Sequence, residues 1–134
     1  MPANHRIRRI QGAYYLATGV WPLIHRHSFE AISGKKRDFW LAETVGAITA
    51  AVGLTLALAG KREDASPEIT LLGVGTAAGF AAVDFAHGLK RQISAVYLID
   101  GVLQLAIIAA YAQEVAARCG RERAGKAQSA PRGK

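Results

Sequence analysis

The chain has 134 residues, 51% of them hydrophobic, and a formal net charge of +7. A chain of this length holds one domain. Its charged residues gather at the ends of apolar stretches, where Lys and Arg of membrane proteins meet the lipid headgroups. This placement argues against nucleic acid as a partner, although a basic chain could otherwise suggest one. The single cysteine, Cys119, excludes an internal disulfide and a paired-cysteine redox motif.

The first predicted span covers about residues 10–25 and follows a basic N-terminal segment, residues 1–9. Basic residues ahead of an apolar run also occur in secretory signal peptides. However, no small-residue cleavage site follows, and Tyr14, Tyr15 and Trp21 are unusual in such a peptide. We therefore expect a retained membrane segment.

The second predicted span, about residues 39–60, is the clearest of the four. Its residues 44–60 carry no charge and no polar group larger than threonine, so every face of the helix is apolar. With its aromatic start, the helix reaches the roughly 20 residues needed to cross a hydrocarbon core of about 30 Å. The third and fourth predicted spans cover about residues 69–89 and 93–116. The third follows a polar turn whose Pro67 suits a helix start.

Four spans place both termini on the same side of the membrane. That side would carry eleven Lys and Arg residues and the opposite side six, which predicts an N-in, C-in orientation. The basic cluster at residues 35–37, on the outer side, opposes this assignment. It belongs to the longest connection, residues 27–38, for which we expect a short interfacial helix or a re-entrant turn. The polar, basic tail of residues 118–134 is expected to be disordered in the cytoplasm and held against anionic lipid.

The predicted fold class is therefore all-α, a polytopic transmembrane four-helix bundle with its membrane domain at residues 10–117. Small residues let helices in lipid approach each other closely, and seven-residue spacing keeps a set on one helix face. We expect the spaced glycines to form packing seams, although glycine is also simply common in apolar helices. The glycines concerned are Gly12, Gly19, Gly46, Gly53 and Gly60, at seven-residue spacing, and the GxxxG pair Gly75 and Gly79.

Two carboxylates inside predicted spans need an explanation, because a charge at the bilayer centre costs about 2.5–3.5 kcal/mol. Asp84 precedes the outer end of the third span and Asp100 follows the start of the fourth, so we expect both at similar depth. His87 follows Asp84 by one helical turn and can share its face. Narrow polar stripes also run along two spans, which is typical of buried hydrogen-bonding seams. These stripes are Gln11, Tyr15, Thr18, Pro22 and His25 in the first span and Tyr97, Asp100, Gln104, Tyr111 and Glu114 in the fourth.

These patterns predict a polar cluster in the outer half of the bundle. Three interpretations of it stay open: acids that pair with basic or tyrosine side chains and set the helix register, a pocket for a ligand, proton or cation, or a metal site. Histidine and carboxylate are suitable metal ligands, but no spacing here matches a motif such as HExxH, so we assign neither a metal nor a cofactor. The candidate residues are Asp84, Asp100, His87, Glu43, His25, Tyr15, Thr18, Tyr97 and Gln104.

Several segments resemble a group of small uncharacterised bacterial four-helix membrane proteins, whose layout is similar to that of DoxX-like proteins. They are residues 14–23 (YYLATGVWPL), 28–30 (SFE), 38–41 (DFWL) and 97–100 (YLID). The resemblance implies four spans and the bacterial cytoplasmic (inner) membrane. It implies no defined reaction and no catalytic residue. Small multidrug exporters also have four helices but rely on a glutamate in the first span, which is absent here, and the absence of a cysteine pair excludes the vitamin K epoxide reductase bundle.

The sequence favours a non-enzymatic membrane protein that acts as an accessory subunit or binds a small ligand through the outer polar cluster. The alternative is a small oligomeric transporter coupled to protons or cations through Asp84 and Asp100. An enzyme ranks third, because no nucleophile–base pair or cofactor motif is visible. The expected partners are the lipid bilayer and either a second copy of the chain or another membrane protein.

Overall fold

The structure is a computed structural model that describes residues 4–62, 66–131 and 133. Residues 1–3 of the basic N-terminal segment, residues 63–65 of the turn before the third predicted span, and tail residues 132 and 134 lie outside it. Three of its helices are long and apolar enough to cross a membrane, those at Phe39–Ala59, Pro67–Gly88 and Val96–Ser129. The chain is therefore an all-α, multi-pass membrane protein. Within the described residues the helices are α1 (Asn4–Ile24), α2 (Arg26–Ser33), α3 (Phe39–Ala59), α4 (Pro67–Gly88) and α5 (Val96–Ser129).

Local sequence explains where several helices begin and end. Helix α4 begins at Pro67, whose fixed φ and missing N–H suit the first helical position. Helix α1 ends at Ile24 because His25 leaves the helical region with a φ of −140° and becomes the N-cap of α2. Helix α2 ends at Gly34, whose φ of +86° lies in a region that residues with a Cβ atom rarely adopt.

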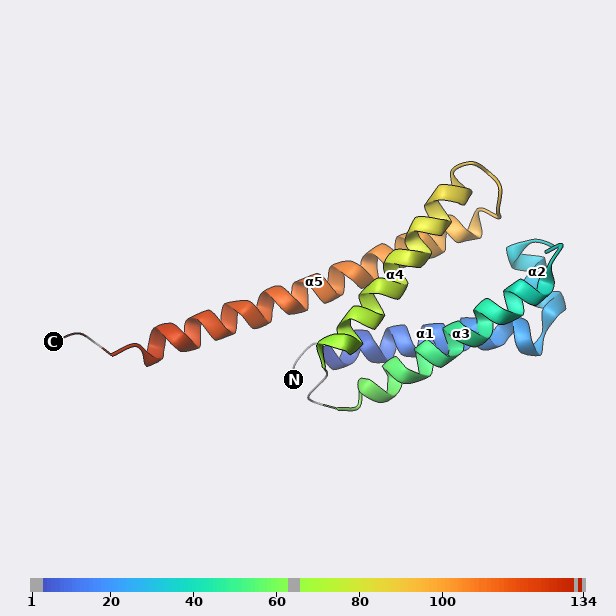
Figure 1. The fold of residues 1–134 in the computed structure, drawn as a ribbon. Helices are drawn as coiled ribbons and strands as arrows, with labels where there is room; N and C mark the ends of the chain where they lie inside the picture. The colour runs from blue at the N-terminus through green and yellow to red at the C-terminus, as the bar shows by residue number, and fades with distance from the viewer. Residues whose placement is uncertain (1–3, 63–65, 132, 134) are drawn as a thin grey trace.

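Helices α1 and α3 lie antiparallel and side by side, in contact through glycine (Figure 1). A Cβ atom on Gly19 would lie 2.5 Å from the backbone nitrogen of Ala50, and one on Gly12 would lie 2.5 Å from that of Ala57. Only glycine allows this approach, since the nearest atoms belong to the opposite backbone. The seam predicted from the seven-residue spacing is confirmed for all five glycines, Gly12, Gly19, Gly46, Gly53 and Gly60, because a Cβ atom on any of them would meet atoms of the opposite helix at 3.0 Å or less.

Helices α4 and α5 form the second antiparallel pair. Gly88 of α4 packs on the Leu98 side chain, and Gly101 of α5 packs on the Phe85 ring. The predicted seam at Gly75 and Gly79 is wrong for contacts within the chain, because a Cβ atom there would meet no heavy atom within 4 Å. The buried residues of α4 occur at three- or four-residue spacing, and both glycines lie off that face. The buried face of α4 consists of Gly73, Ala77, Ala81, Asp84 and Gly88.

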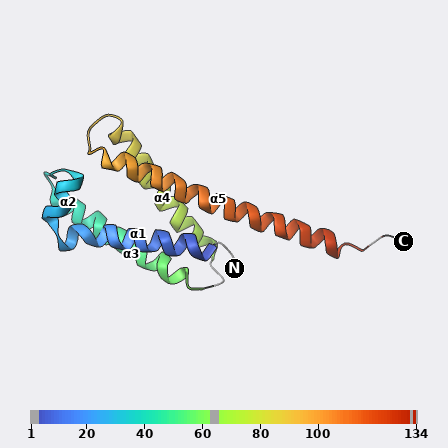
Figure 2. The ribbon, with the colours of Figure 1, turned by 180° about the vertical axis from the view of Figure 1, so that it is seen from behind.

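The two helix pairs meet at the end of the bundle where α1 and α4 begin, and they diverge towards α2 and the α4–α5 turn (Figures 1 and 2). Helix α5 has 34 residues and extends beyond the other helices at the first of these ends. The structure thus differs from the expected disordered tail, because the described part is helical up to Ser129. Ala, Arg, Glu, Lys and Gln favour helix, Glu122 precedes Lys126 by one turn, and the first proline after α5 begins is Pro131.

Candidate functional site

A buried polar seam joins α1 to the α4/α5 pair. Gln11 is at its centre: its side-chain amide donates to the Gly73 carbonyl at 2.8 Å and accepts from the Tyr111 hydroxyl at 2.7 Å. One turn further along α1, the Tyr15 hydroxyl donates to Oε1 of Gln104 at 2.5 Å. Gln11, Tyr15 and Gln104 are almost completely buried. The seam therefore consists of side chains from both predicted polar stripes.

At the end where the helix pairs converge, the seam continues to a buried arginine. The Arg8 side chain is 1% exposed, and its Nη2 donates to the Thr70 hydroxyl at 3.2 Å. Glu114 of α5 is also buried and its charge attracts that of Arg8. The basic start of α1 thus packs inside the protein at this position.

Towards the diverging end, the seam leads to two carboxyl groups. The Tyr14 hydroxyl donates to Oδ1 of Asp100, and the Gln104 amide lies 3.3 Å from both Asp100 oxygens. The Asp84 carboxyl lies against that of Asp100 and is 3% exposed. Its Oδ2 atom has no hydrogen-bond partner within the described residues. Asp100 is therefore held in the seam, whereas Asp84 keeps an acceptor available.

Beside these carboxyl groups, a cavity of about 900 Å³ separates the two helix pairs. This volume lies within the range of roughly 300–1,000 Å³ that is usual for small-ligand sites. All five helices contribute to its walls, and apolar groups predominate in them. The aromatic side chains of the cavity come from α1, α2, α4 and α5. They are Tyr14, Tyr15, Trp21, Phe29, Phe80 and Tyr97.

Helix α2 lies at the mouth of the cavity and is anchored on the α1/α3 pair. The Trp21 indole N–H donates to the Ser28 hydroxyl at 2.8 Å, and the His25 ring accepts from the Ser28 backbone N–H at 3.2 Å. The Phe29 ring packs edge-on between Trp21 and Phe39, with centroid distances of 5.9 and 6.3 Å. These contacts place Phe29 in the cavity wall.

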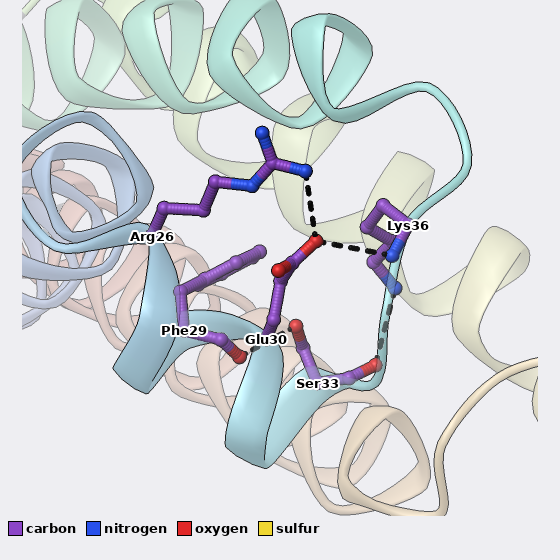
Figure 3. A network of polar contacts seen from close by, with 5 residues as sticks. All are labelled: Arg26, Phe29, Glu30, Ser33 and Lys36. Carbon is purple, nitrogen blue, oxygen red and sulfur yellow. Dashed lines mark hydrogen bonds and ion pairs between the residues drawn. The ribbon is translucent and has the colours of Figure 1, made fainter.

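A small ionic network orders the segment after α2 (Figure 3). Glu30 accepts from the Arg26 guanidinium at 3.4 Å and from the Lys36 backbone N–H at 3.3 Å. Partial desolvation opposes ionisation of Glu30, but these two donors outweigh it and hold the pKa of Glu30 below its usual value. The Lys36 ammonium donates to the Ser33 carbonyl at 3.1 Å.

Two contacts cross the mouth from α2 and the segment after it to α5 and the turn before it. The Lys36 ammonium lies 4.8 Å from the centre of the Tyr97 ring. The Ser94 hydroxyl donates to the Ile32 carbonyl at 3.3 Å. Lys36 thus contacts both sides of the cavity mouth.

The structure brings together six of the nine predicted site residues in the cavity wall: Tyr15, Thr18, Asp84, Tyr97, Asp100 and Gln104. The other three do not reach it. His25 caps α2, the His87 ring bonds to the Gln92 amide at 2.6 Å in the turn after α4, and Glu43 is exposed on α3. Each lies at a helix end, where a small rotation decides whether a side chain faces the bundle or the surroundings.

The cavity also contains residues that the sequence did not single out as a site. Tyr14 directly precedes Tyr15 and therefore lies about 100° away from the predicted polar stripe of α1. Trp21, Phe29 and Phe80 carry no polar pattern, so periodicity alone could not distinguish them from membrane-facing aromatics. The hydrogen bond from Tyr14 to Asp100 of α5, which only the structure shows, places Tyr14 in the polar seam.

Within the residues described, no three side chains of His, Cys, Asp or Glu converge as a metal site. No family model, curated protein or solved structure was found to match the chain. The likeness to DoxX-like proteins stays a prediction from the sequence.

Proposed function

We propose that this protein is a non-enzymatic, four-span membrane protein that binds a small amphipathic molecule in the cavity between its helix pairs. One observation carries the proposal: a cavity of about 900 Å³ combines apolar walls with the buried Asp84 carboxyl, whose Oδ2 has no partner in the described chain. Sites for small molecules usually have this composition, with largely apolar walls and a few polar groups that orient the ligand.

Helix α1 is the proposed fourth span. The span was predicted at about residues 10–25, and α1 contains nearly all of it. With its basic first turns the helix has 21 residues, about 31 Å, so that it reaches from the core into the headgroup region. Its backbone contacts with α3 from Gly12 to Gly19 support a common depth for both helices. Its basic first turns explain why α1 is less apolar than the other spans.

The proposed orientation is N-in, C-in, with the cavity in the outer half of the bundle. The excess of Lys and Arg on the side of the termini supports it. The resemblance to small bacterial four-helix proteins supports the bacterial cytoplasmic membrane as the location.

Filling the cavity tests the binding function. Among the described residues the Thr18 hydroxyl bonds only within α1, to the Tyr14 and Tyr15 carbonyls at 2.8 and 3.5 Å, so Thr18→Trp adds volume without breaking a bond between helices there. Thr55→Trp is the matched control, since the hydroxyl of the exposed Thr55 donates to the Ala51 carbonyl of its own helix at 2.9 Å. Native mass spectrometry of protein released from mild detergent should show a retained small molecule in wild type and Thr55→Trp, and none in Thr18→Trp. Equal occupancy in all three proteins would contradict the proposal.

The contact between Asp84 and Asp100 favours a second function, a small transporter coupled to protons or cations. Intramembrane carboxylates commonly mark such pathways. In that case Asp84→Asn and Asp100→Asn should insert normally but lose flux in proteoliposomes. Normal transport by both variants would exclude a coupling role.

A further inference from the structure

The chemistry of the cavity indicates the class of its ligand, an inference that rests on the proposed binding function. Asp84 lines the cavity and is only 3% exposed. One of its carboxyl oxygens has no hydrogen-bond partner in the described residues. The second carboxyl, Asp100, lies against it. An acceptor of this kind, buried beside another acid, favours a ligand that brings positive charge or hydrogen-bond donors.

The aromatic walls of the cavity also indicate a positively charged ligand. Six of the ten aromatic residues of the chain line this one cavity. Phe80 and Tyr15 meet edge to face at 5.6 Å, and Tyr14 lies 6.0 Å from Tyr15. The faces of aromatic rings attract cations, most strongly where water is excluded. Tyr14 and Tyr15 thus join the acids to an aromatic wall.

Basic residues at the mouth of the cavity favour a negatively charged ligand instead. Lys35, Lys36 and Arg37 line the outer part of the cavity together with Asp38. Lys36 already interacts with the Ser33 carbonyl and the Tyr97 ring. The mouth thus favours an anion and the interior favours a cation, so the charge preference of the cavity is a measurable property.

We infer that the cavity binds a lipophilic organic cation, with the charged centre beside Asp84 and the apolar body against the aromatic walls. Size supports an organic ligand over a bare metal ion, because about 900 Å³ far exceeds the space of one ion. A site of mixed apolar and aromatic lining with two acids also provides no set of three metal-binding side chains among the described positions.

The test compares two probes of nearly equal size and opposite charge, tetraphenylphosphonium and tetraphenylborate. Equilibrium binding is measured on the full chain in lipid nanodiscs, with empty nanodiscs subtracted. We expect saturable binding of tetraphenylphosphonium to wild type, weakened about tenfold or more by Asp84→Asn. Glu43→Gln is the matched control, because Glu43 is an exposed acid on α3 outside the cavity wall. It should bind the cation as wild type does.

Three results would overturn the inference. Stronger saturable binding of tetraphenylborate, abolished by Thr18→Trp, would refute the cation class while leaving the binding function intact. Equal losses in Asp84→Asn and Glu43→Gln would show a general charge effect and no site. Saturable binding of neither probe would refute both the inference and the binding of amphipathic molecules of this size.

A second variant keeps the test decisive should Asp84→Asn fail to fold. Phe80→Leu removes one aromatic wall and keeps both acids, and it should weaken tetraphenylphosphonium binding several-fold. Phe85→Leu is its control, since Phe85 packs on Gly101 and lies outside the cavity. Unchanged binding by Phe80→Leu would contradict the aromatic contribution.

Discussion

Helix α1 presents two different surfaces to its neighbours. Towards α3 it presents Gly12 and Gly19, so that the two backbones touch. Towards α4 and α5 it presents Gln11 and Tyr15, which hydrogen-bond to Gly73, Tyr111 and Gln104. In lipid there is no hydrophobic force between helices, so both close packing and hydrogen bonds serve to hold them together.

The two interfaces of α1 differ in how continuously they are packed. Backbone contact fixes the α1/α3 pair along its length, since an added methyl group would collide with a main chain. The polar interface holds α1 to α4 and α5 over residues 8–15, and the cavity lies beside its far end, where the two pairs diverge. A rigid pair beside a less continuous interface is an arrangement in which a binding site can form without loosening the whole bundle.

The largest effect should come from a single methyl group in the close-packed pair. Gly19→Ala brings a Cβ atom 2.5 Å from the Ala50 backbone nitrogen and should lower stability by about 3 kcal/mol, at the upper end of overpacking costs. Gly75→Ala, with open space at the Cβ position, should be neutral or slightly stabilising because alanine favours helix. Thermal unfolding in detergent compares the two, and equal midpoints would show that α1 and α3 do not pack as described.

A smaller effect is expected from the centre of the polar seam. Gln11→Leu removes the bonds to the Gly73 carbonyl and the Tyr111 hydroxyl, and it should cost about 1–2 kcal/mol, near the upper limit for bonds between membrane helices. The exposed Gln113 on α5 provides the control substitution Gln113→Leu. Denaturant unfolding measures both. Equal unfolding of the two variants would contradict a stabilising role of the seam.

The two carboxyl groups should respond in opposite directions. Asp100→Asn disturbs the bonds from Tyr14 and Gln104 and should lower stability by about 1 kcal/mol. Asp84→Asn removes a buried carboxyl group that has one oxygen without a hydrogen-bond partner among the described residues, and it should leave the unfolding midpoint unchanged or raise it. The comparison is made by thermal unfolding of both variants. A lower midpoint for Asp84→Asn would indicate that Asp84 supports the fold instead of awaiting a ligand.

The smallest effect concerns the network at the mouth. Because the pKa of Glu30 is lower in the folded protein than its usual value, the ionised form is favoured there. Its contribution is therefore present at neutral pH and is lost as pH falls through the folded-state pKa, below the ordinary value of about 4.3. Amide hydrogen-exchange protection of α2, corrected for intrinsic rates, should decrease in that window, while protection of α3 does not. In Glu30→Gln the α2 amides should show no such step, and a step that persists would assign the effect to another group.

Much of the local structure could be predicted along the chain. Hydropathy located α3, α4 and α5, Pro67 marked a helix start, and seven-residue spacing identified the glycines of the α1/α3 contact. The polar stripes named Gln11, Tyr15, Gln104 and Tyr111, all of which the structure buries. Each of these signals is a short-range period or a run, so it can be read without knowing where other helices lie.

The predictions failed where the position of a residue depended on contacts with other parts of the chain. Gly75 and Gly79 have the spacing of a packing seam, yet Gly73 and Ala77 face α5 instead. His87 has the spacing to follow Asp84, yet its ring bonds to Gln92 in the turn. The tail was expected to be disordered for want of periodicity, yet its helix-favouring composition carries α5 to Ser129.

By itself the sequence determined that apolar helices long enough to cross a membrane form here, and which side chains on them are polar. Only the tertiary structure decided which polar groups meet, because that depends on the rotation of each helix and the angle between the two pairs. The bond between Tyr111 and Gln11 joins residues 100 positions apart, and no local period specifies such a contact. The cavity arises from the same geometry, since it is the space left where two packed pairs diverge.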